Sequence, residues 1–172
     1  MTLGTARLRL RDLAPADAPF ILTLLNEPSF IQNIGDRGVR TLEEARTYIQ
    51  GGPIASYVRF GFGLYLVELL ESGTPIGICG ILQRDTLPDP DLGFAFLPAY
   101  WKQGYALESA AAVRHYARAV LGLGRLLAIT NPTNAGSIRL LEKLGFKFER
   151  MMRMGDGQPE LKLFADEDEH HG

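Results

Sequence analysis

One turn of the sequence combines a cation, a glycine and the start of a helix, in residues 101–108 (WKQGYALE). An apolar run at 92–97 precedes it and an Ala-rich run at 109–120 follows, which predicts a strand, a turn and a helix. The first N–H groups of a helix have no partner within it, and the helix dipole adds partial positive charge there. Gly104 lets an anion approach the backbone closely, and Lys102 adds a cation. The pattern predicts a phosphate-binding turn, although Gly104 alone is equally typical of a plain turn.

A polar pair lies at the start of a later predicted helix. Asn134 is placed to cap that helix by accepting hydrogen bonds from its first N–H groups. Ser137 lies in the first turn, where its hydroxyl is typical of a capping or solvent-facing group. Ile138, Leu141 and Leu144 recur at helical spacing, so they predict the side of this helix that packs on the core.

Other residues that could carry chemistry do not cluster. The three histidines are His115, on a predicted helix, and His170 and His171, among the last residues, so we expect no metal site. The single cysteine, Cys79, lies in an apolar run with no flanking basic residue, which predicts an unreactive core side chain. The Gly-x-Ser-x-Gly motif is absent, and residues 122–124 (GLG) lack the third glycine of a dinucleotide fingerprint.

Hydrophobic patterning indicates which elements position these residues. Strands are predicted at 6–13, 63–70, 75–82, 91–97, 125–130, 146–154 and 160–165. Five helices are predicted. The first is opened by Pro15 and Asp17 together, and the second by the Thr41–Glu44 capping box. The others begin near Ile54, after the 101–108 turn and at Asn134. Residues 51–53 (GGP) predict the end of the second helix, and residues 30–40 are predicted to be irregular.

This order of elements predicts one α+β domain over residues 1–172. We expect a mixed, mostly antiparallel twisted sheet of about seven strands with helices on both faces. The strand–helix–strand unit from 91 to 130 should form a right-handed parallel crossover. Residues 166–172 are charged and are predicted to fray.

The composition excludes several classes of protein. The 172 residues are 46% hydrophobic and 22% charged, with a net charge of −2, so nothing favours a nucleic-acid partner. Residues 1–13 have no continuous apolar segment typical of a signal peptide, and no apolar stretch reaches the roughly 18 residues of a membrane span. We therefore expect a cytoplasmic protein, as a monomer or homodimer, without a membrane partner.

Two motifs resemble those of a known family. Residues 91–94 (DLGF) followed by 101–108 (WKQGYALE) are similar to the central pyrophosphate motif of the GNAT superfamily of N-acetyltransferases, in the branch of the RimJ/RimL protein N-terminal acetyltransferases. Residues 134–146 (NAGSIRLLEKLGF) resemble the family's next motif, and the order of elements matches over nearly the whole chain. Trp101 and Ala106 stand where the family pattern often has Gln or Arg and Gly, as is common in this branch. An aromatic residue such as Trp101 at this junction is also typical of simple packing.

The resemblance implies an acyltransferase with acetyl-CoA as donor. Direct attack of a neutral amine on the thioester would form a tetrahedral oxyanion and release a thiolate. The contacts to coenzyme A that the resemblance implies are Phe96, Leu97, Lys102, Gln103, Gly104, Tyr105, Ala106, Asn134, Ser137 and Lys143. A backbone N–H near Phe96 would stabilise the oxyanion, and the amide of Asn134 would bond the pantetheine arm. Ser137 would protonate or hydrogen-bond the thiolate, which many relatives do with a tyrosine that this helix lacks.

The base that deprotonates the amine is left open. Asp91 occupies a position where relatives often carry an acid, and together with Ser137 it is the predicted catalytic pair. The alternatives are Glu68, Asp85, His115 and Glu149. A base that acts through water needs no large pKa shift, so the sequence does not choose among them.

The acceptor amine is also left open. By the resemblance, the parts of the chain that face it are the first two helices, the loop between them and the last strands. The candidate residues are Phe30, Ile31, Asn33, Asp36, Arg37, Arg40, Tyr57, Phe60 and Phe62. Asp36 could meet a cationic amine, or the charges at 36–40 could be a solvated loop. A peptide α-amine and a small amine are both compatible with the fold. The alternative functions are a non-catalytic domain that binds or senses coenzyme A, and an interaction module without a ligand.

Overall fold

An eight-stranded sheet organises the protein, whose computed structural model describes residues 1–166. The strands are β1 (Thr2–Gly4), β2 (Leu8–Asp12), β3 (Leu64–Leu69), β4 (Pro75–Leu82), β5 (Asp91–Phe96), β6 (Leu127–Thr130), β7 (Lys147–Arg153) and β8 (Glu160–Ala165). The α-helices are α1 (Ala18–Leu25), α2 (Pro28–Asn33), α3 (Leu42–Ile49), α4 (Ala55–Phe60), α5 (Tyr105–Ala119) and α6 (Ala135–Lys143). Shorter turns of helix are the 3₁₀ segments η1 (Pro15–Asp17) and η3 (Pro98–Tyr100) and the π-helix η2 (Gln50–Ile54).

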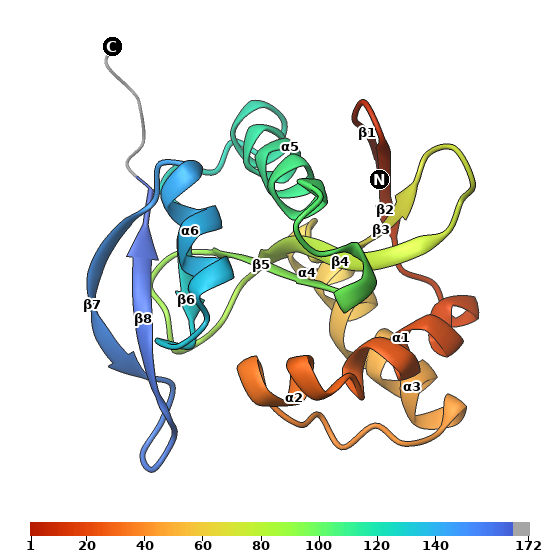
Figure 1. Ribbon diagram of the computed structural model, residues 1–172, viewed down its shortest axis with the longest axis horizontal. Coiled ribbons are helices and arrows are strands. Elements are labelled where there is room, and N and C mark those ends of the chain that lie inside the picture. The colour runs from red at the N-terminus through yellow and green to blue at the C-terminus, as the bar shows by residue number, and fades with distance from the viewer. Residues whose placement is uncertain (167–172) are drawn as a thin grey trace.

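The sheet is mixed and mostly antiparallel. Its order is β1-β2-β3-β4-β5-β6-β8-β7, and only the neighbours β5 and β6 run parallel. Helices α5 and α6 cover one face, while α1, α2 and α3 cover the other (Figure 1). The predicted α+β class is confirmed, with β1 as a strand beyond the seven expected. This three-residue strand pairs with β2 and is too short to show an alternating pattern.

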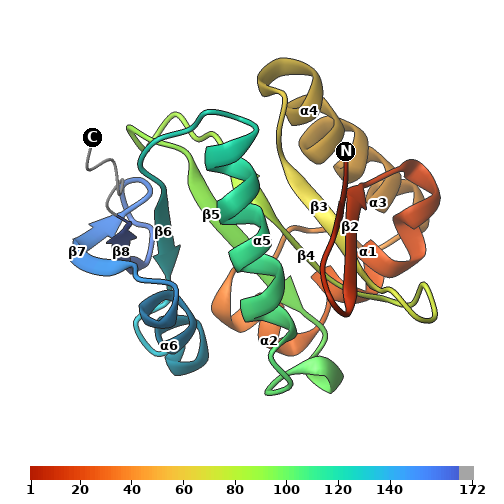
Figure 2. The same ribbon diagram turned by 90° about the horizontal axis from the view of Figure 1, so that it is seen from above.

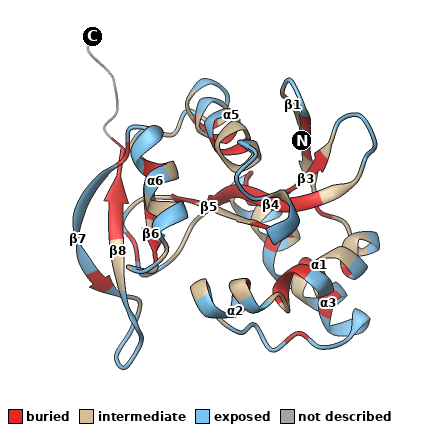
Figure 3. Ribbon diagram, viewed as in Figure 1, coloured by how far each residue is buried: buried red, intermediate tan, exposed pale blue. Residues whose placement is uncertain are grey.

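Two hydrophobic clusters attach the helices to the sheet. On one face, the buried residues Ala110, Val113 and Ala117 of α5 recur at helical spacing and pack with Leu92 and Phe96 of β5. On the other face, buried residues of α1 and α3 pack on the middle strands. Burial is therefore concentrated in the strands and the inner sides of the helices (Figure 3). Strand β5 is held between both clusters, which fixes the segment that leads into the 101–108 turn.

Three local expectations are wrong. Helix α2 spans residues 28–33, so residues 30–33 of the segment that was expected to be irregular are helical. The predicted stop at 51–53 is instead a π-helical segment that joins α3 to α4 without a break. The charged end does not fray at Asp166, which is fully buried. Residues 167–172 of the predicted tail lie outside the described residues.

Asp166 is buried because α5 supplies cations for it. Its carboxylate lies 2.8 Å from both Arg114 Nε and an Arg118 guanidinium nitrogen, and it accepts a hydrogen bond of 3.0 Å from the Leu126 N–H. A buried charge is tolerated when it is paired and hydrogen-bonded. This cluster joins the end of β8 to the C-terminal half of α5.

Candidate active site

The 101–108 turn adopts an unusual backbone at the start of α5. Lys102 has φ of +61° and is the one non-glycine residue with positive φ among residues 1–166, and Gly104 has φ of +84°. Gly104 is the N-cap of α5, and no side chain caps the helix there. Left-handed residues within a turn aim successive N–H groups outward and create a concave anion site. A strained non-glycine residue is also typical of functional turns.

Hydrogen bonds within the turn hold its shape. Trp101 Nε1 donates to the Phe96 carbonyl at 2.9 Å, so Trp101 does more than pack at the junction. Gln103 Nε2 donates to the Ala99 carbonyl at 2.9 Å. The side chain of Gln103 is thereby bonded to the protein, whereas Lys102 is exposed and has no ion pair within the described residues.

Residues between β1 and β2 contact the same turn. We call the contact the Arg7 clamp, and it consists of Arg7, Thr5 and Glu108. Arg7 Nε lies 2.8 Å from Glu108 Oε1, and Arg7 Nη1 donates to the Gln103 carbonyl at 3.0 Å. The guanidinium lies over the Tyr105 ring, 4.3 Å from its centroid. Thr5 Oγ1 donates to the other oxygen of Glu108 at 2.6 Å. The clamp therefore fixes both ends of the turn to a segment about a hundred residues away in sequence.

The clamp also controls a charge next to the proposed anion site. Burial alone would raise the pKa of Glu108, but hydrogen bonds from Thr5 and Arg7 outweigh it and hold that pKa below its usual value of 4.5. Glu108 is thus an anion in the first turn of α5 at neutral pH. Because Arg7 pairs with it, its negative charge is balanced where a phosphate would bind. Sequence reasoning missed Arg7 and Thr5, since nothing local to either residue marks a partner on α5.

Strands β5 and β6 separate soon after they meet. Their register contains a single pair, Asp91 with Leu127, and the Leu127 N–H donates to the Pro90 carbonyl. Beyond that point the two strands diverge toward the N-terminal end of α5 (Figure 2). The divergence leaves a length of β5 edge that β6 does not bond, beside the 101–108 turn.

The side of β5 on which each backbone group lies follows from the bonds at its two ends. The Leu97 N–H donates to Ile76 on β4, and the Pro90 carbonyl accepts from β6. Because neighbouring residues of a strand direct these groups to opposite sides, the N–H groups of Leu92, Phe94 and Phe96 lie on the β6 side. These groups line the divergence. Leu97 bonds the protein through both its N–H and its carbonyl, so only its side chain remains for a ligand.

Helix α6 carries the second polar pair to the other side of the divergence. Asn134 is the N-cap, and its Oδ1 accepts a hydrogen bond of 3.2 Å from the Ser137 N–H, which confirms the predicted cap. Ser137 is half-buried, on the same side of the helix as the buried Leu141. Lys143 lies in the last turn, about 13 Å along the axis from Asn134, so these two residues would reach different parts of a ligand.

Asp91 is the one candidate base on a strand that borders the divergence. Its side chain is 1% exposed and pairs with Arg84 at 3.1 Å. Burial raises the pKa of Asp91 above its usual value, and the nearby Arg84 opposes that rise. A raised pKa makes a carboxylate a better proton acceptor.

The other four candidates lie elsewhere. Glu68 is buried on β3 and pairs with Arg9 and Arg11, with β4 between it and β5. The remaining three are exposed: Asp85 in the β4–β5 loop, His115 on α5, and Glu149, which pairs with Arg125, on β7.

The residues expected to face an acceptor do not form one cluster. Asp36 and Arg40 pair with each other in an exposed loop, as a solvated loop would, and Phe30 is buried in the core. The hydroxyl of Tyr57 donates to the Leu64 carbonyl and accepts from the Leu13 N–H, so it is fully used within the protein.

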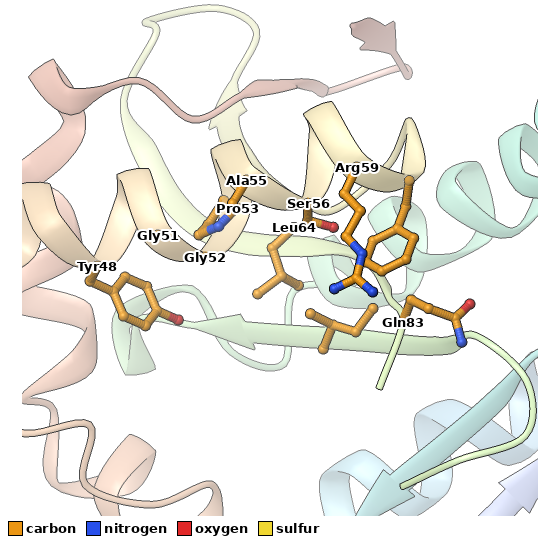
Figure 4. A pocket seen from close by; sticks show the side chains of 11 residues that line it. Tyr48, Gly51, Gly52, Pro53, Ala55, Ser56, Arg59, Leu64 and Gln83 are labelled. Carbon is orange, nitrogen blue, oxygen red and sulfur yellow. The ribbon is translucent and has the colours of Figure 1, made fainter. Parts of the chain in front are cut away.

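A groove of about 290 Å³ lies beside α4, on the face of the sheet opposite α5. We name it the α4 groove. Its walls include Gly51, Gly52, Arg59, Leu64, Leu82 and Gln83 (Figure 4). Sequence reasoning missed this groove, because the segment that shapes it was expected to end a helix.

The described residues contain neither a cluster of metal ligands nor a reactive thiol. Within residues 1–166, no three His, Cys, Asp or Glu side chains gather closely enough to hold a metal ion. Cys79 is fully buried, and burial raises the pKa of its thiol to about 12, so the predicted core role is confirmed. None of the described helices is both long enough and apolar enough to cross a membrane.

Comparison with known proteins agrees with this geometry. The family model for an acetyltransferase (GNAT) domain matches residues 7–147. An uncharacterized N-acetyltransferase of Bacillus subtilis (strain 168), YoaA, is 28% identical over 153 residues, covering 88% of this chain and 85% of YoaA. A crystal structure of an acetyltransferase from Agrobacterium tumefaciens str. C58 is 29% identical and has a TM-score of 0.81, with 96% of this chain and 93% of that one covered.

A RimL ribosomal L7/L12 alpha-N-protein acetyltransferase, solved in complex with coenzyme A, shares the fold with a TM-score of 0.83 at 20% identity, over 98% of both chains. Because the family model covers most of the sequence, this chain belongs to the GNAT family of acetyltransferases, the acyltransferases that depend on acetyl-CoA. The predicted family, and its RimJ/RimL-type structural neighbours, are thus confirmed.

Proposed function

We propose that this protein transfers the acetyl group of acetyl-CoA to a primary amine by direct attack. The observation that carries the proposal is the divergence of β5 and β6 next to the uncapped N-terminus of α5. A strand edge with N–H groups suits the amide-rich pantetheine arm, by the same main-chain bonding that adds a peptide to a sheet. The helix N-terminus suits the pyrophosphate. In coenzyme A the pantetheine arm is joined to the pyrophosphate, and in this protein the free edge of β5 leads into the N-terminus of α5. The protein therefore presents the two binding features in the same order as the ligand presents the two groups.

The turn would hold the nucleotide end of the donor. N–H groups at Gly104, Tyr105 and Ala106 are not capped by a side chain, and Lys102 adds an exposed cation. Gln103 contributes through its backbone, because its side chain is bonded to Ala99. On α6, the Nδ2 group of Asn134 remains for the pantetheine arm, while Lys143 at the far end of the helix would reach only the nucleotide.

Backbone and side-chain donors would stabilise the charges that develop in the reaction. The N–H of Phe94 or Phe96, on the β6 side of β5, is placed to donate to the oxyanion. Ser137 would donate its hydroxyl proton, or a hydrogen bond, to the departing thiolate. Its N–H is already bonded to Asn134, which fixes the position of the residue at the start of α6.

Asp91 is the base that we propose for the attacking ammonium. It points to the face of the sheet opposite α5, because side chains alternate along β5 and Leu92 belongs to the α5 face. Since its side chain is 1% exposed, proton transfer from the amine would pass through a bridging water rather than by direct contact.

A direct assay separates this function from its alternative. The protein is incubated with acetyl-CoA and a panel of primary amines, including peptides with free N-termini, and the release of free thiol is measured. We expect thiol release that depends on the amine and acetylated product of matching amount. Binding of coenzyme A in a calorimeter without turnover on any amine would favour the non-catalytic binding domain. Absence of coenzyme A binding would reject both.

The acceptor that we favour is a peptide α-amine or a small molecule with a primary amine. The RimL protein that shares this fold is a ribosomal L7/L12 alpha-N-protein acetyltransferase. That likeness supports a peptide, and the family membership supports amines in general. The amine panel should therefore contain both kinds.

A further inference from the structure

The α4 groove is lined by η2, whose backbone is π-helical. Residues 50–54 form this segment between α3 and α4, with Pro53 inside it. Proline has no N–H for a helical bond, and a single π-helical turn accommodates the lost bond within a continuous helix. Such turns occur frequently at functional sites. Here residues 51–53 of the segment line the groove together with Leu64 of β3 and Leu82 of β4.

Glycines keep the groove open along this wall. Gly51 and Gly52 both line it, and a Cβ placed on either would meet no atom within 4 Å. Neither residue has positive φ, so the backbone does not require glycine there. Glycine in a helix costs roughly 0.5–1 kcal/mol relative to alanine. Two glycines in succession therefore lower helix stability and leave space for a ligand.

The chemistry of the groove is an apolar floor with a cation at its edge. Leu64 and Leu82 are the leucines that line the groove, and we call them its floor. Arg59 extends from α4 into the space beside Leu64 (Figure 4). The guanidinium of Arg59 lies over the Phe60 ring, 4.8 Å from its centroid, and no carboxylate lies within ion-pair distance of it in the part of the chain described. Arg84, close by in sequence to the groove residue Gln83, is instead neutralised by Asp91. Arg59 is therefore the cation that can bind an anion in the groove.

The groove adjoins the strand at which acetyl transfer would occur. A Cβ on Gly93 would lie 3.2 Å from Leu82 and 3.5 Å from Leu64, so the floor of the groove lies against the middle of β5. Gly93 is next to Phe94, whose N–H faces the divergence. The acetyl donor would approach from the α5 face, and the groove lies on the opposite face. A ligand in the groove would thus extend toward the thioester from the other side of the sheet.

We propose that the α4 groove binds the acceptor and that the acceptor carries a carboxylate, which pairs with Arg59 while its primary amine extends toward Gly93. This inference rests on the proposed acetyl transfer. The carboxylate and the amine are separated by an apolar spacer, which contacts Leu64 and Leu82. That chemistry belongs to a small ω-amino acid or to a peptide with an acidic side chain near its N-terminus.

The test compares acceptors that differ in charge alone. The probes are 6-aminohexanoate against 6-aminohexanamide, and the dipeptide amide Ala-Glu against Ala-Gln, each with saturating acetyl-CoA. We expect a lower KM for the carboxylate member of at least one pair, by about 10- to 100-fold, the range of a hydrogen bond to a charged group. The pair that shows the difference identifies the source as small molecule or peptide.

Variants assign the effect to the groove. Arg59→Gln should abolish the preference by raising the KM for the carboxylate acceptor alone, and Arg59→Lys should retain part of it. Gly52→Leu should raise KM for both members of the pair while leaving thermal stability unchanged or higher. Arg46→Gln, an exposed arginine on α3 outside the groove, is the matched control and should change nothing. The KM for acetyl-CoA should be the same in all four variants.

The outcomes separate this inference from the proposed function. Equal KM values within both pairs, or equal losses for both members in Arg59→Gln, would overturn the groove assignment while the acetyltransferase function stands. Binding of the product N-acetyl-6-aminohexanoate, followed by calorimetry, gives a readout without turnover. Binding that Arg59→Gln leaves unchanged would also overturn the inference. Absence of thiol release with every amine would remove the function and the inference together.

Discussion

The 101–108 turn and the α4 groove lie on opposite faces of one sheet and are built in opposite ways. The turn is held by hydrogen bonds and an ion pair from three segments, and its cation Arg7 has a carboxylate partner. The groove has glycine walls, an apolar floor and Arg59 without a carboxylate partner in residues 1–166. Both regions leave one cation for a ligand, Lys102 at the turn and Arg59 in the groove. They differ in how the site is shaped: bonds from distant segments fix the backbone of the turn in advance, whereas glycines and apolar side chains leave open space in the groove.

The largest effect is expected from a negative charge placed in the turn. Gly104→Glu should weaken coenzyme A binding by at least about 100-fold, because it removes a left-handed glycine and adds an anion where phosphate binds. Gly73→Glu is the matched control, since Gly73 also has positive φ and lies in the β3–β4 turn. Calorimetric titration of both variants measures the effect. Equal affinities would show that the turn does not bind the donor.

A smaller effect is expected on catalysis alone. Ser137→Ala should lower kcat by about 10- to 100-fold, a modest loss for a residue that donates a proton or a hydrogen bond to the leaving group. The affinity for coenzyme A should be unchanged. Thr133→Ala, which removes an exposed hydroxyl from the loop just before α6, should leave kcat unaltered. Steady-state rates with an active amine provide the comparison. Unchanged turnover in Ser137→Ala would remove this residue from the mechanism.

Removal of the Arg7 clamp should loosen the turn without abolishing the site. In Arg7→Met, Glu108 loses its counter-ion and repels phosphate, so the KM for acetyl-CoA should rise by about five-fold while the acceptor KM stays constant. Arg9→Met, two residues further along the chain in β2, is the control, because Arg9 pairs with Glu68 instead. A rise in the acceptor KM would mean that the turn and the α4 groove are coupled, whereas we expect them to bind their ligands independently.

The smallest effect distinguishes Glu108 of the turn from Asp91 of β5 by the pH dependence of stability. The pKa of Glu108 is lowered on folding, so its contribution to stability is present above pH 4.5 and is lost as pH falls through the folded-state pKa. The pKa of Asp91 is raised on folding, so Asp91 affects stability in the opposite direction. Its contribution to the free energy of unfolding falls as pH rises from 3.8 through the folded-state pKa of Asp91. Glu108→Gln should therefore lower Tm more at pH 7 than at pH 3. Asp91→Asn should lower Tm less at pH 7 than at pH 3; the reverse order would contradict the assignment.

Local patterns predicted the turn, and distant partners account for what they missed. Gly104, Asn134 and the strands around them could be predicted, because capping and alternation depend on neighbours in sequence. Arg7 could not, since its partner Glu108 is 101 residues away. The burial of Asp166 could not be predicted for the same reason. Its charged neighbours in sequence indicated a frayed tail, whereas the arginines that pair with it, Arg114 and Arg118, lie on α5.

The α4 groove was hidden for a different reason. The sequence Gly51-Gly52-Pro53 carries the usual signals of a helix end, and packing of the segment between α3 and α4 overrides them. The groove brings together Arg59 of α4, Leu64 of β3 and Leu82 of β4. The position of α4 depends on this continuous helix, so the groove cannot be predicted until the π-helical segment is known.

Amide hydrogen exchange with and without coenzyme A tests most directly that the donor binds between β5 and the start of α5. The exchange of the Phe94, Phe96, Tyr105 and Ala106 amides should slow when coenzyme A is added, because the ligand would bond or cover them. The amides of Gly51 and Gly52, in the α4 groove on the other face, should exchange at an unchanged rate. Protection of the groove amides, with no change at Phe94 and Tyr105, would contradict this account.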